Sequence, residues 1–207
     1  MTQSSLWLGA EPLILASGSS ARAQLLASIA IPFVVVKPQV DEREVEAPLI
    51  ARQASAREIA QALADAKALN VSRTMQGRFV LGSDQLLEIE GELLHKPEGR
   101  EGAKAHLRRL SNQTHCLHSA ATIARDGLVV AQADDVAHLT MRELTESFIE
   151  AYLDAAGEAV LASVGAYQIE GLGQHLFAQV EGNPATIMGL PLFALLKKMR
   201  ALHLVRA

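Results

Sequence analysis

The dipeptide Asp126-Gly127 separates two runs of residues that favour β-strands, His115–Ala124 before it and Leu128–Leu139 after it. Asp-Gly is a typical two-residue turn of a β-hairpin, because both positions need positive φ angles that these residue types tolerate. A long hairpin is stable only when other elements cover its apolar face. The fold must therefore contain an antiparallel pair of strands and a layer that packs against it.

Shorter strands alternate with helices in the first part of the chain. The apolar runs Leu13–Ala16 and Phe33–Val36 predict two buried strands, and the pattern over Arg22–Ile31 predicts a helix between them. Leu49–Leu69 carries the longest helical pattern, with Asn70 as its expected end. Strands that alternate with helices, combined with hairpins, predict an α/β domain with a mixed sheet.

The second half of the chain continues this alternation. A hairpin is expected around Glu90-Gly91, and helices are expected over Pro97–Leu110, Thr140–Ala156 and Pro191–Leu202. The segment Ala159–Ala178 is rich in glycine and small residues. Such a composition indicates tight backbone turns near a ligand, although loops without a function are also rich in glycine.

The composition excludes several classes of protein. With 207 residues, of which 49% are apolar, residues 1–207 are predicted to form a single domain. A net charge of -4 gives no electrostatic footprint for nucleic acid, and no apolar run reaches the roughly 18 residues of a membrane span. Cys116 is the single cysteine, which fits a reducing compartment, and the opening MTQSSLWLGAEP does not resemble a signal peptide. We therefore expect a cytoplasmic protein with no nucleic-acid or membrane partner.

Two stretches carry residues suited to phosphate chemistry. In LGSDQLLEIEGELLHKP, an apolar run enters a turn at Asp84, and the chain returns to place Lys96 before a proline. A carboxylate and an ammonium in this arrangement could hold a metal ion and a phosphate, although Asp after Gly-Ser often only closes a turn. In SGSSAR, hydroxyls and backbone N–H groups gather at a helix N-terminus. That is a natural anion site, with plain helix capping as the alternative.

Four segments, in this order, resemble the Maf family of nucleotide pyrophosphatases. They are LILASGSSARAQLL, then VDE at 40–42 with LADAKA at 63–68, then LGSDQLLEIEGELLHKP with LSNQTH at 110–115, and finally GAYQIEGLGQHLFAQVEGNPATIMGLPL. The resemblance implies a single two-lobed α/β domain, with a central mixed sheet flanked by helices and a cleft between the lobes. It also implies a homodimer and the metal-dependent hydrolysis of a nucleoside triphosphate to the monophosphate and pyrophosphate.

The resemblance also assigns the residues that bind the phosphates. Ser17, Ser19 and Arg22 match the family's phosphate-binding opening, Lys67 matches its helix lysine, and Lys96 matches the lysine of its Lys-Pro motif. A triphosphate carries about four negative charges, so its site needs cations. Arginine offers a bidentate fork, whereas each lysine acts as a point charge.

Two carboxylates complete the site that the resemblance implies. Asp84 matches the catalytic acidic residue and would act as general base, and Glu42 with Asp84 would hold Mg²⁺, Mn²⁺ or Co²⁺. Either a metal-bound water or a water oriented by Asp84 would attack the α-phosphorus, and pyrophosphate would leave. The sequence departs from the family pattern at Ser20 and Ala21, where a proline and an arginine are usual, and at Asn112 in the Leu-Ser-Gly turn. Asparagine tolerates the left-handed conformation, so that turn is expected to persist.

Gln85 and Glu170 indicate which base is bound. The branch of the family that acts on dTTP and UTP usually has Gly-Ala-Asp-Thr at the catalytic turn and glutamine in the later motif, so this chain resembles the 7-methyl-GTP branch instead. A carboxylate can accept two hydrogen bonds from a guanine edge; the alternative is that Glu170 is a solvated loop charge. Ala21 would leave room at the family's variable position, and Trp7 is expected in a mobile N-terminal segment.

Three functions therefore remain open from the sequence. The first is a house-cleaning pyrophosphatase that removes 7-methyl-GTP. The second is a pyrophosphatase for dTTP and UTP, against which Gln85 and Glu170 argue. The third is a nucleotide-binding regulator of septum formation and cell division, which would not need two carboxylates and two lysines together. Metal-dependent release of pyrophosphate distinguishes an enzyme from a regulator.

Overall fold

The computed structural model describes residues 6–207. The chain forms two compact units, each assembled from distant segments. The first unit holds the chain up to Gln85 together with Ser119–Asp135 and Gly189–Ala207, and the second holds Leu86–His118 and Val136–Met188. The first five residues of the segment that argued against a signal peptide lie outside the described residues.

A seven-stranded mixed sheet confirms the predicted α/β class, in the strand order β2-β1-β3-β5-β6-β7 with β4 paired to β3. Strand β1 is parallel to β2 and β3, whereas β4 and β7 are antiparallel to their neighbours. The strands are β1 (Leu13–Ala16), β2 (Phe33–Val35), β3 (Phe79–Ile89), β4 (Glu92–Leu94), β5 (Thr114–Arg125), β6 (Leu128–Met141) and β7 (Phe177–Glu181). The α-helices are α1 (Ser20–Ser28), α2 (Glu42–Ala51), α3 (Ala56–Ser72), α4 (Gly99–Leu110), α5 (Glu146–Ala156), α6 (Pro184–Ile187) and α7 (Leu192–Ala201).

The two predicted hairpins are present. Asp126 and Gly127 have φ angles of 52° and 75° between β5 and β6, which is the pair of positive angles that a type I′ turn requires. Glu90 and Gly91, with φ angles of 53° and 81°, connect β3 to β4 in the same way. Local turn chemistry therefore fixes the antiparallel part of the sheet.

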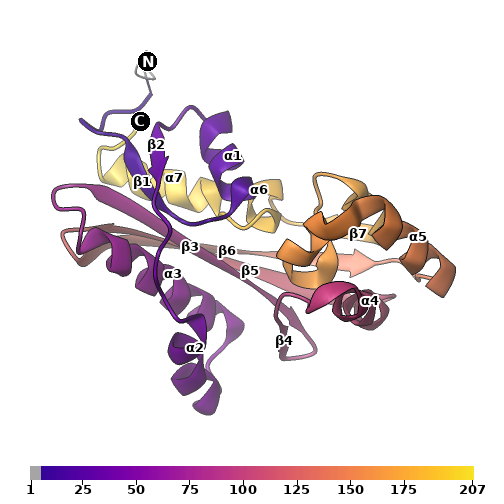
Figure 1. Ribbon diagram of the computed structural model, residues 1–207. Helices are drawn as coiled ribbons and strands as arrows, with labels where there is room; N and C mark the ends of the chain where they lie inside the picture. The colour runs from indigo at the N-terminus through magenta and orange to yellow at the C-terminus, as the bar shows by residue number, and fades with distance from the viewer. Residues whose placement is uncertain (1–5) are drawn as a thin grey trace. The chain divides into compact units, whose positions relative to one another are not determined.

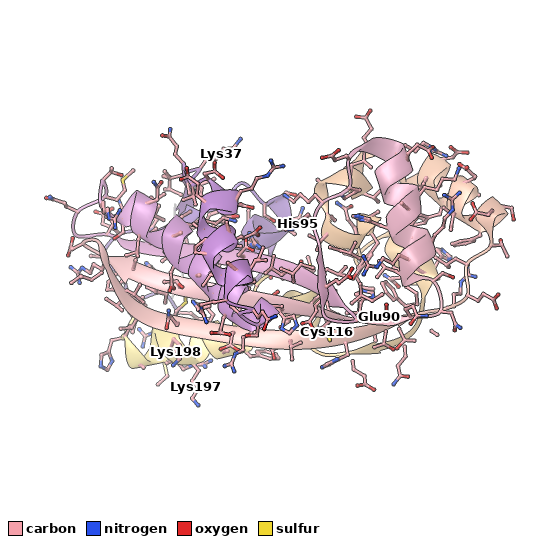
Figure 2. All side chains as sticks on the ribbon, turned by 90° about the horizontal axis from the view of Figure 1, so that it is seen from below. Lys37, Glu90, His95, Cys116, Lys197 and Lys198 are labelled. Atoms are coloured by element: carbon pink, nitrogen blue, oxygen red, sulfur yellow. The ribbon has the colours of Figure 1, made fainter. Side chains whose placement is uncertain are left out.

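Close packing of α3 against β3 organises the first unit. A Cβ atom built on Gly82 would lie 2.5 Å from the backbone N and 2.9 Å from the Cβ of Ala68, so only glycine allows this approach. Helix α3 covers one face of the strands, and α1 and α7 lie on the opposite face (Figure 1). Figure 2 shows the same order from below, with Lys197 and Lys198 extending from α7.

The helical region before the central strands differs from the prediction. The acidic segment after Val40 is helix α2, because Asp41 caps it and accepts from the backbone N–H of Arg43. The single long helix expected over Leu49–Leu69 is two helices, since Ser55 and Glu58 form a capping box that starts α3 anew. Helix α3 then runs past Asn70 to Ser72.

Two further expectations of burial were wrong in the first unit. Strand β2 is an edge strand, and Val34 and Val35 are exposed, because β1 is its only neighbour in the sheet. Trp7 is not mobile but buried at 4% exposure, since it forms a β-bridge with Val205 and its Nε1 donates to the carbonyl of Glu11. Trp7 is therefore part of the core, whereas Leu8 beside it is exposed.

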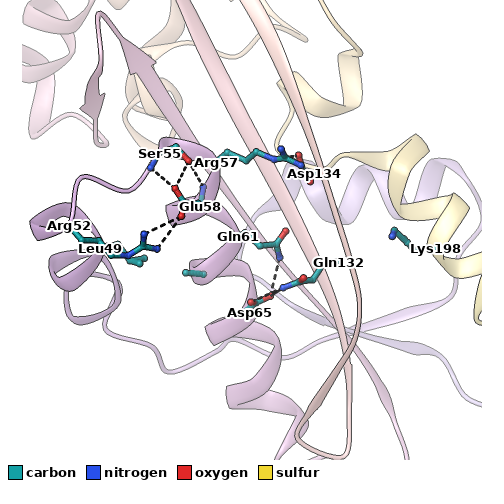
Figure 3. Close-up of a pocket in the computed structure, with 11 residues that line it drawn as sticks. Leu49, Arg52, Ser55, Arg57, Glu58, Gln61, Asp65, Gln132, Asp134 and Lys198 are labelled. Atoms are coloured by element: carbon teal, nitrogen blue, oxygen red, sulfur yellow. Dashed lines mark hydrogen bonds and ion pairs between the residues drawn. The ribbon is translucent and has the colours of Figure 1, made fainter.

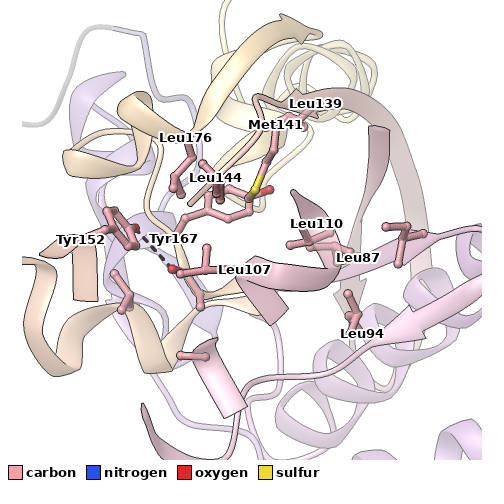
Figure 4. Packing of buried hydrophobic residues seen from close by; sticks show 14 of the residues in the cluster. Leu87, Leu94, Leu107, Leu110, Leu139, Met141, Leu144, Tyr152, Tyr167 and Leu176 are labelled. Atoms are coloured by element: carbon pink, nitrogen blue, oxygen red, sulfur yellow. Dashed lines mark hydrogen bonds between the residues drawn. The ribbon is translucent and has the colours of Figure 1, made fainter. Parts of the chain in front are cut away.

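The second unit has an apolar cluster of its own (Figure 4). Leu107 and Leu110 of α4 and Tyr152 of α5 belong to it, as do residues of the short 3-10 helices η1 (Gly157–Ala162), η2 (Val164–Ala166) and η3 (Leu172–Leu176). Helix α5 begins later than predicted, at Glu146 with Thr145 as its cap, because β6 extends to Met141. None of the helices within residues 6–207 is long and apolar enough to cross a membrane.

Candidate active site

Three charged side chains of the first unit meet at one point. The Nζ of Lys67 lies 2.5 Å from Oδ1 of Asp84 and 2.6 Å from Oε1 of Glu42. The side chains of Lys67 and Asp84 are only 10% and 9% exposed, whereas Glu42 is 54% exposed. A nearly buried ammonium that binds two carboxylates is not a solvated lysine on a helix surface. These three predicted residues therefore form one cluster.

Local structure explains why they meet. Lys67 follows Ile59 and Leu63 at four-residue spacing, so it lies on the buried face of α3 rather than at its margin. Gly82 lets that helix approach β3, where Asp84 lies two residues further on. The cap at Asp41 starts α2, so Glu42 is the first residue of that helix. Each charged side chain is thus placed by a rigid element.

Burial and charge act in opposite directions on Asp84. Burial raises the pKa of its carboxyl, and the positive charges of Lys67 and Arg22 oppose that rise. A carboxylate with a raised pKa is a stronger base. Loss of water lowers the pKa of the Arg22 guanidinium, while Asp84 and Glu42 raise it. Arginine stays charged regardless, so Arg22 contributes a permanent positive charge close to the two carboxylates.

The serine-rich turn after β1 orients Arg22. The Oγ of Ser19 accepts from the backbone N of Arg22 at 3.4 Å and caps α1. Buried Ser17 accepts at its Oγ from Nη1 of Arg22 and from the backbone N of Ser19, both at 3.2 Å. Of the two predicted serines, Ser19 therefore caps the helix and Ser17 binds the guanidinium of Arg22.

Three residues that the sequence reasoning did not select lie around this arginine and strand β3. The carbonyl of Gly189 accepts from Nε of Arg22 at 2.8 Å and from Oγ of Ser83 at 3.0 Å. The buried Ser119 accepts from Nε2 of Gln85 at 3.1 Å. Gly189 lies in MGLPL, within the fourth family-like segment, and that was the one signal that could have identified it.

Three other predicted residues are partly or fully exposed. Ala21 is half-buried in the first turn of α1, beside Arg22. Lys96 and Glu170 belong to the second unit and are exposed, Lys96 after β4 and Glu170 in the turn before η3. Their exposure leaves both side chains available to a ligand. Their roles stay predictions from the resemblance.

The carboxylate pair fits a divalent cation. Glu42 and Asp84 already direct one oxygen each at a single positive charge, the Lys67 ammonium. Mg²⁺ is commonly held by one or two carboxylates, with water and substrate phosphates as the other ligands. Within residues 6–207, no group of three or more His, Cys, Asp or Glu residues is placed to hold a metal. Two carboxylates would leave the other ligand positions of such a cation to water and phosphate.

A separate surface groove has none of the predicted site residues in its lining (Figure 3). Its two arginines pair with carboxylates of the same groove, Arg52 with Glu58 and Arg57 with Asp134. The Asp65 carboxylate accepts from Gln132 and from other neutral side chains. Both arginines are therefore already compensated, and Lys198 is the other cation in the described lining.

Residues 12–202 match the family described as Maf-like protein. The chain is 52% identical over 196 residues to the nucleoside triphosphate pyrophosphatase of Nitrobacter winogradskyi, covering 95% of this chain and 96% of that protein. It is 47% identical over 200 residues to the protein of the same name from Bradyrhizobium diazoefficiens, covering 97% and 98%. It is 44% identical over 188 residues to the 7-methyl-GTP pyrophosphatase of Brucella abortus, covering 91% and 94%.

Proposed function

The chain belongs to the Maf family, and we propose that it is a metal-dependent pyrophosphatase that hydrolyses 7-methyl-GTP to the monophosphate and pyrophosphate. The reaction class is that of a hydrolase acting on an acid anhydride, as in relatives named nucleoside triphosphate pyrophosphatase. The observation that carries the proposal is the contact of the Lys67 ammonium with Asp84 and Glu42 beside the phosphate-binding turn of Arg22.

Cations of the first unit would bind the triphosphate. Arg22 is held by Ser17 and Gly189, so its guanidinium is oriented before substrate arrives. Preorganised charge stabilises the negative charge that develops on the phosphate oxygens without a reorganisation cost. Lys96 of the second unit would add a further point charge.

Asp84 would accept a proton from the attacking water. Its raised pKa makes it a better base than a solvated aspartate, and the positive charge of the nearby Lys67 opposes that rise. Mg²⁺, Mn²⁺ or Co²⁺ bound by Glu42 and Asp84 would supply neutralisation of phosphate charge. Water held by Asp84 would attack the α-phosphorus, which breaks the α–β anhydride bond and releases pyrophosphate.

The choice of 7-methyl-GTP is supported by Glu170, by Gln85 and by one group of relatives. Glu170 is exposed in a turn bounded by glycines, so both of its oxygens are open to a guanine edge. The relative from Brucella abortus bears the name 7-methyl-GTP pyrophosphatase. The alternatives are a dTTP and UTP pyrophosphatase and a nucleotide-binding regulator of septum formation. We further propose a house-cleaning role in the cytoplasm and a homodimer, without a nucleic-acid partner.

The test is a pyrophosphate-release assay with Mg²⁺ or Mn²⁺ on 7-methyl-GTP, GTP, dTTP, UTP and CTP, comparing the wild type with Glu170→Gln. We expect a preference for 7-methyl-GTP that falls in Glu170→Gln, because an amide cannot accept both hydrogen bonds from guanine. Glu158→Gln is the matched control, since Glu158 is exposed at the start of η1 in the same unit. A preference for dTTP or UTP would support the second function, and absence of pyrophosphate would favour the regulator.

A further inference from the structure

One backbone carbonyl connects the catalytic strand to the phosphate-binding arginine. The oxygen of Gly189 accepts from Nε of Arg22 at 2.8 Å and from Oγ of Ser83 at 3.0 Å. Ser83 is fully buried and directly precedes Asp84 on β3, and its single hydroxyl proton is shared between the carbonyls of Gly189 and Ala120, the latter at 2.7 Å. The position of Arg22 is thereby tied to the strand that carries Asp84.

Position 189 admits no side chain without a cost. Gly189 has a φ angle of +94°, a conformation that other residues rarely adopt. A Cβ atom there would lie 3.3 Å from Nη2 and 3.4 Å from Nε of Arg22, and 3.6 Å from Oε1 of Gln85. The backbone at this point therefore lies against the arginine and the residue after Asp84, with no spare room.

The bond to Gly189 also determines which part of the guanidinium is left for substrate. An arginine has five N–H donors. In Arg22, the Nε–H is used by Gly189 and one Nη1–H by Ser17, which leaves three without an acceptor in the part of the chain that the structure describes. The remaining donors lie on the two terminal nitrogens, the fork that binds phosphate oxygens in pairs.

We propose that Gly189, supported by Ser83, is a positioning residue for triphosphate binding. Its carbonyl binds Nε, and its missing side chain leaves space for the guanidinium, so the fork of Arg22 stays directed at the phosphates. This inference rests on the proposed function, because it assigns a cause to the phosphate-binding role of Arg22. The competing explanation is that Gly189 serves only to turn the chain before α7.

The experiment is a double-mutant cycle between Gly189→Ala and Arg22→Lys, with two readouts. One is the KM and kcat for 7-methyl-GTP, and the other is calorimetric binding of inorganic tripolyphosphate, which needs no turnover. Gly77→Ala is the matched control, because Gly77 also has a positive φ, of +71°, but has no atom within 4 Å of a built Cβ. Melting temperatures of all variants report folding.

Positioning through Arg22 predicts that Gly189→Ala raises KM and weakens tripolyphosphate binding at least tenfold, with kcat changed less. In the Arg22→Lys background the same substitution should change KM less than twofold, because the fork is already absent. Gly77→Ala should leave both readouts unchanged. The inference would be overturned if the KM of the double variant changed by the product of the two single-variant fold-changes. It would also be overturned if Gly189→Ala had the wild-type KM and tripolyphosphate affinity.

Ser83→Ala keeps the inference testable if Gly189→Ala does not fold. It removes one donor to the Gly189 carbonyl without adding volume, so a smaller rise in KM, about threefold, is expected, and it too should vanish in Arg22→Lys. An unchanged KM in Ser83→Ala would then count against the proposal. A wild type that binds tripolyphosphate through Arg22 and Gly189 but hydrolyses no nucleotide would refute the proposed function and retain the inference. A wild-type protein that neither binds tripolyphosphate nor hydrolyses a nucleotide would refute both the proposed function and the inference.

Discussion

Lowering the pH from 7.5 to 5 should destabilise the protein through His115. This ring is 1% exposed in β5, and its Nε2 lies 2.7 Å from the hydroxyl of Tyr167. Its Nδ1 has no hydrogen-bond partner in the described part of the chain. Protonation would therefore place a charge and an unsatisfied N–H in an apolar environment that contains the Phe177 ring. Protonation of His115 is therefore less favourable in the folded protein than in the unfolded chain.

The size of the effect follows from the pKa. Burial lowers the pKa of His115 to about 4, whereas an unfolded histidine titrates near 6.5. Because the folded pKa is the lower one, the stability is present above about pH 6.5 and is lost as the pH falls towards 4. At about 1.4 kcal/mol for each pKa unit, the loss is about 2 kcal/mol between pH 7.5 and 5 and about 3 kcal/mol by pH 4.

Urea unfolding at pH 7.5, 6 and 5 measures the free energy of unfolding for the wild type and His115→Gln. Glutamine can still bond to Tyr167 but does not titrate, so the stability difference between the two proteins should shrink by about 2 kcal/mol from pH 7.5 to 5. His175→Gln, which removes an exposed histidine of the same unit, should keep the wild-type pH profile. Parallel profiles for wild type and His115→Gln would refute the reasoning.

Three further outcomes are expected. Lys67→Met should lower the free energy of unfolding in urea by about 3 kcal/mol, because it leaves buried Asp84 without its ammonium; an unchanged midpoint would contradict the pairing. Ser55→Ala should cost about 1 kcal/mol in thermal unfolding through loss of the α3 capping box, and no change would mean that the helix start is set elsewhere. Calorimetric titration with Mn²⁺ should show weak binding alone and at least tenfold tighter binding with a non-hydrolysable nucleotide analogue, since the proposed metal site has two protein carboxylates, Glu42 and Asp84; equal affinities would contradict a shared site.

Much of the fold could be predicted because its signals are local. The turns at Asp126-Gly127 and Glu90-Gly91 depend on two residues each, and both appear as expected. Strand β1 matches its apolar run from Leu13 to Ala16. The break between α2 and α3 was also encoded locally, by Ser55 and Glu58, but the continuous apolar pattern over Leu49–Leu69 concealed it. The sequence thus contains the signal for two helices, and the prediction of a single helix overlooked it.

The site was predictable only in its residue types. The family-like motifs selected Glu42, Lys67 and Asp84, and the structure brings them into contact. The burial of the Lys67 side chain could not be predicted. Helical spacing shows on which face of the helix a lysine lies, but it does not show the tertiary partner that allows the lysine to be buried. Gly189 acts on Arg22 across 167 positions of the chain, a distance at which no local pattern operates.

The position of bond cleavage tests the central claim most directly. Hydrolysis of 7-methyl-GTP in ¹⁸O-enriched water, followed by mass spectrometry of the products, should place the label in 7-methyl-GMP and leave pyrophosphate unlabelled. Asp84→Asn should reduce the rate by about a hundredfold or more while the protein stays folded at the assay temperature, because it removes the general base without changing the shape of the side chain. Its melting temperature should fall, because buried Lys67 loses a carboxylate partner. Label in pyrophosphate, release of orthophosphate, or an Asp84→Asn enzyme with the wild-type rate would contradict the account.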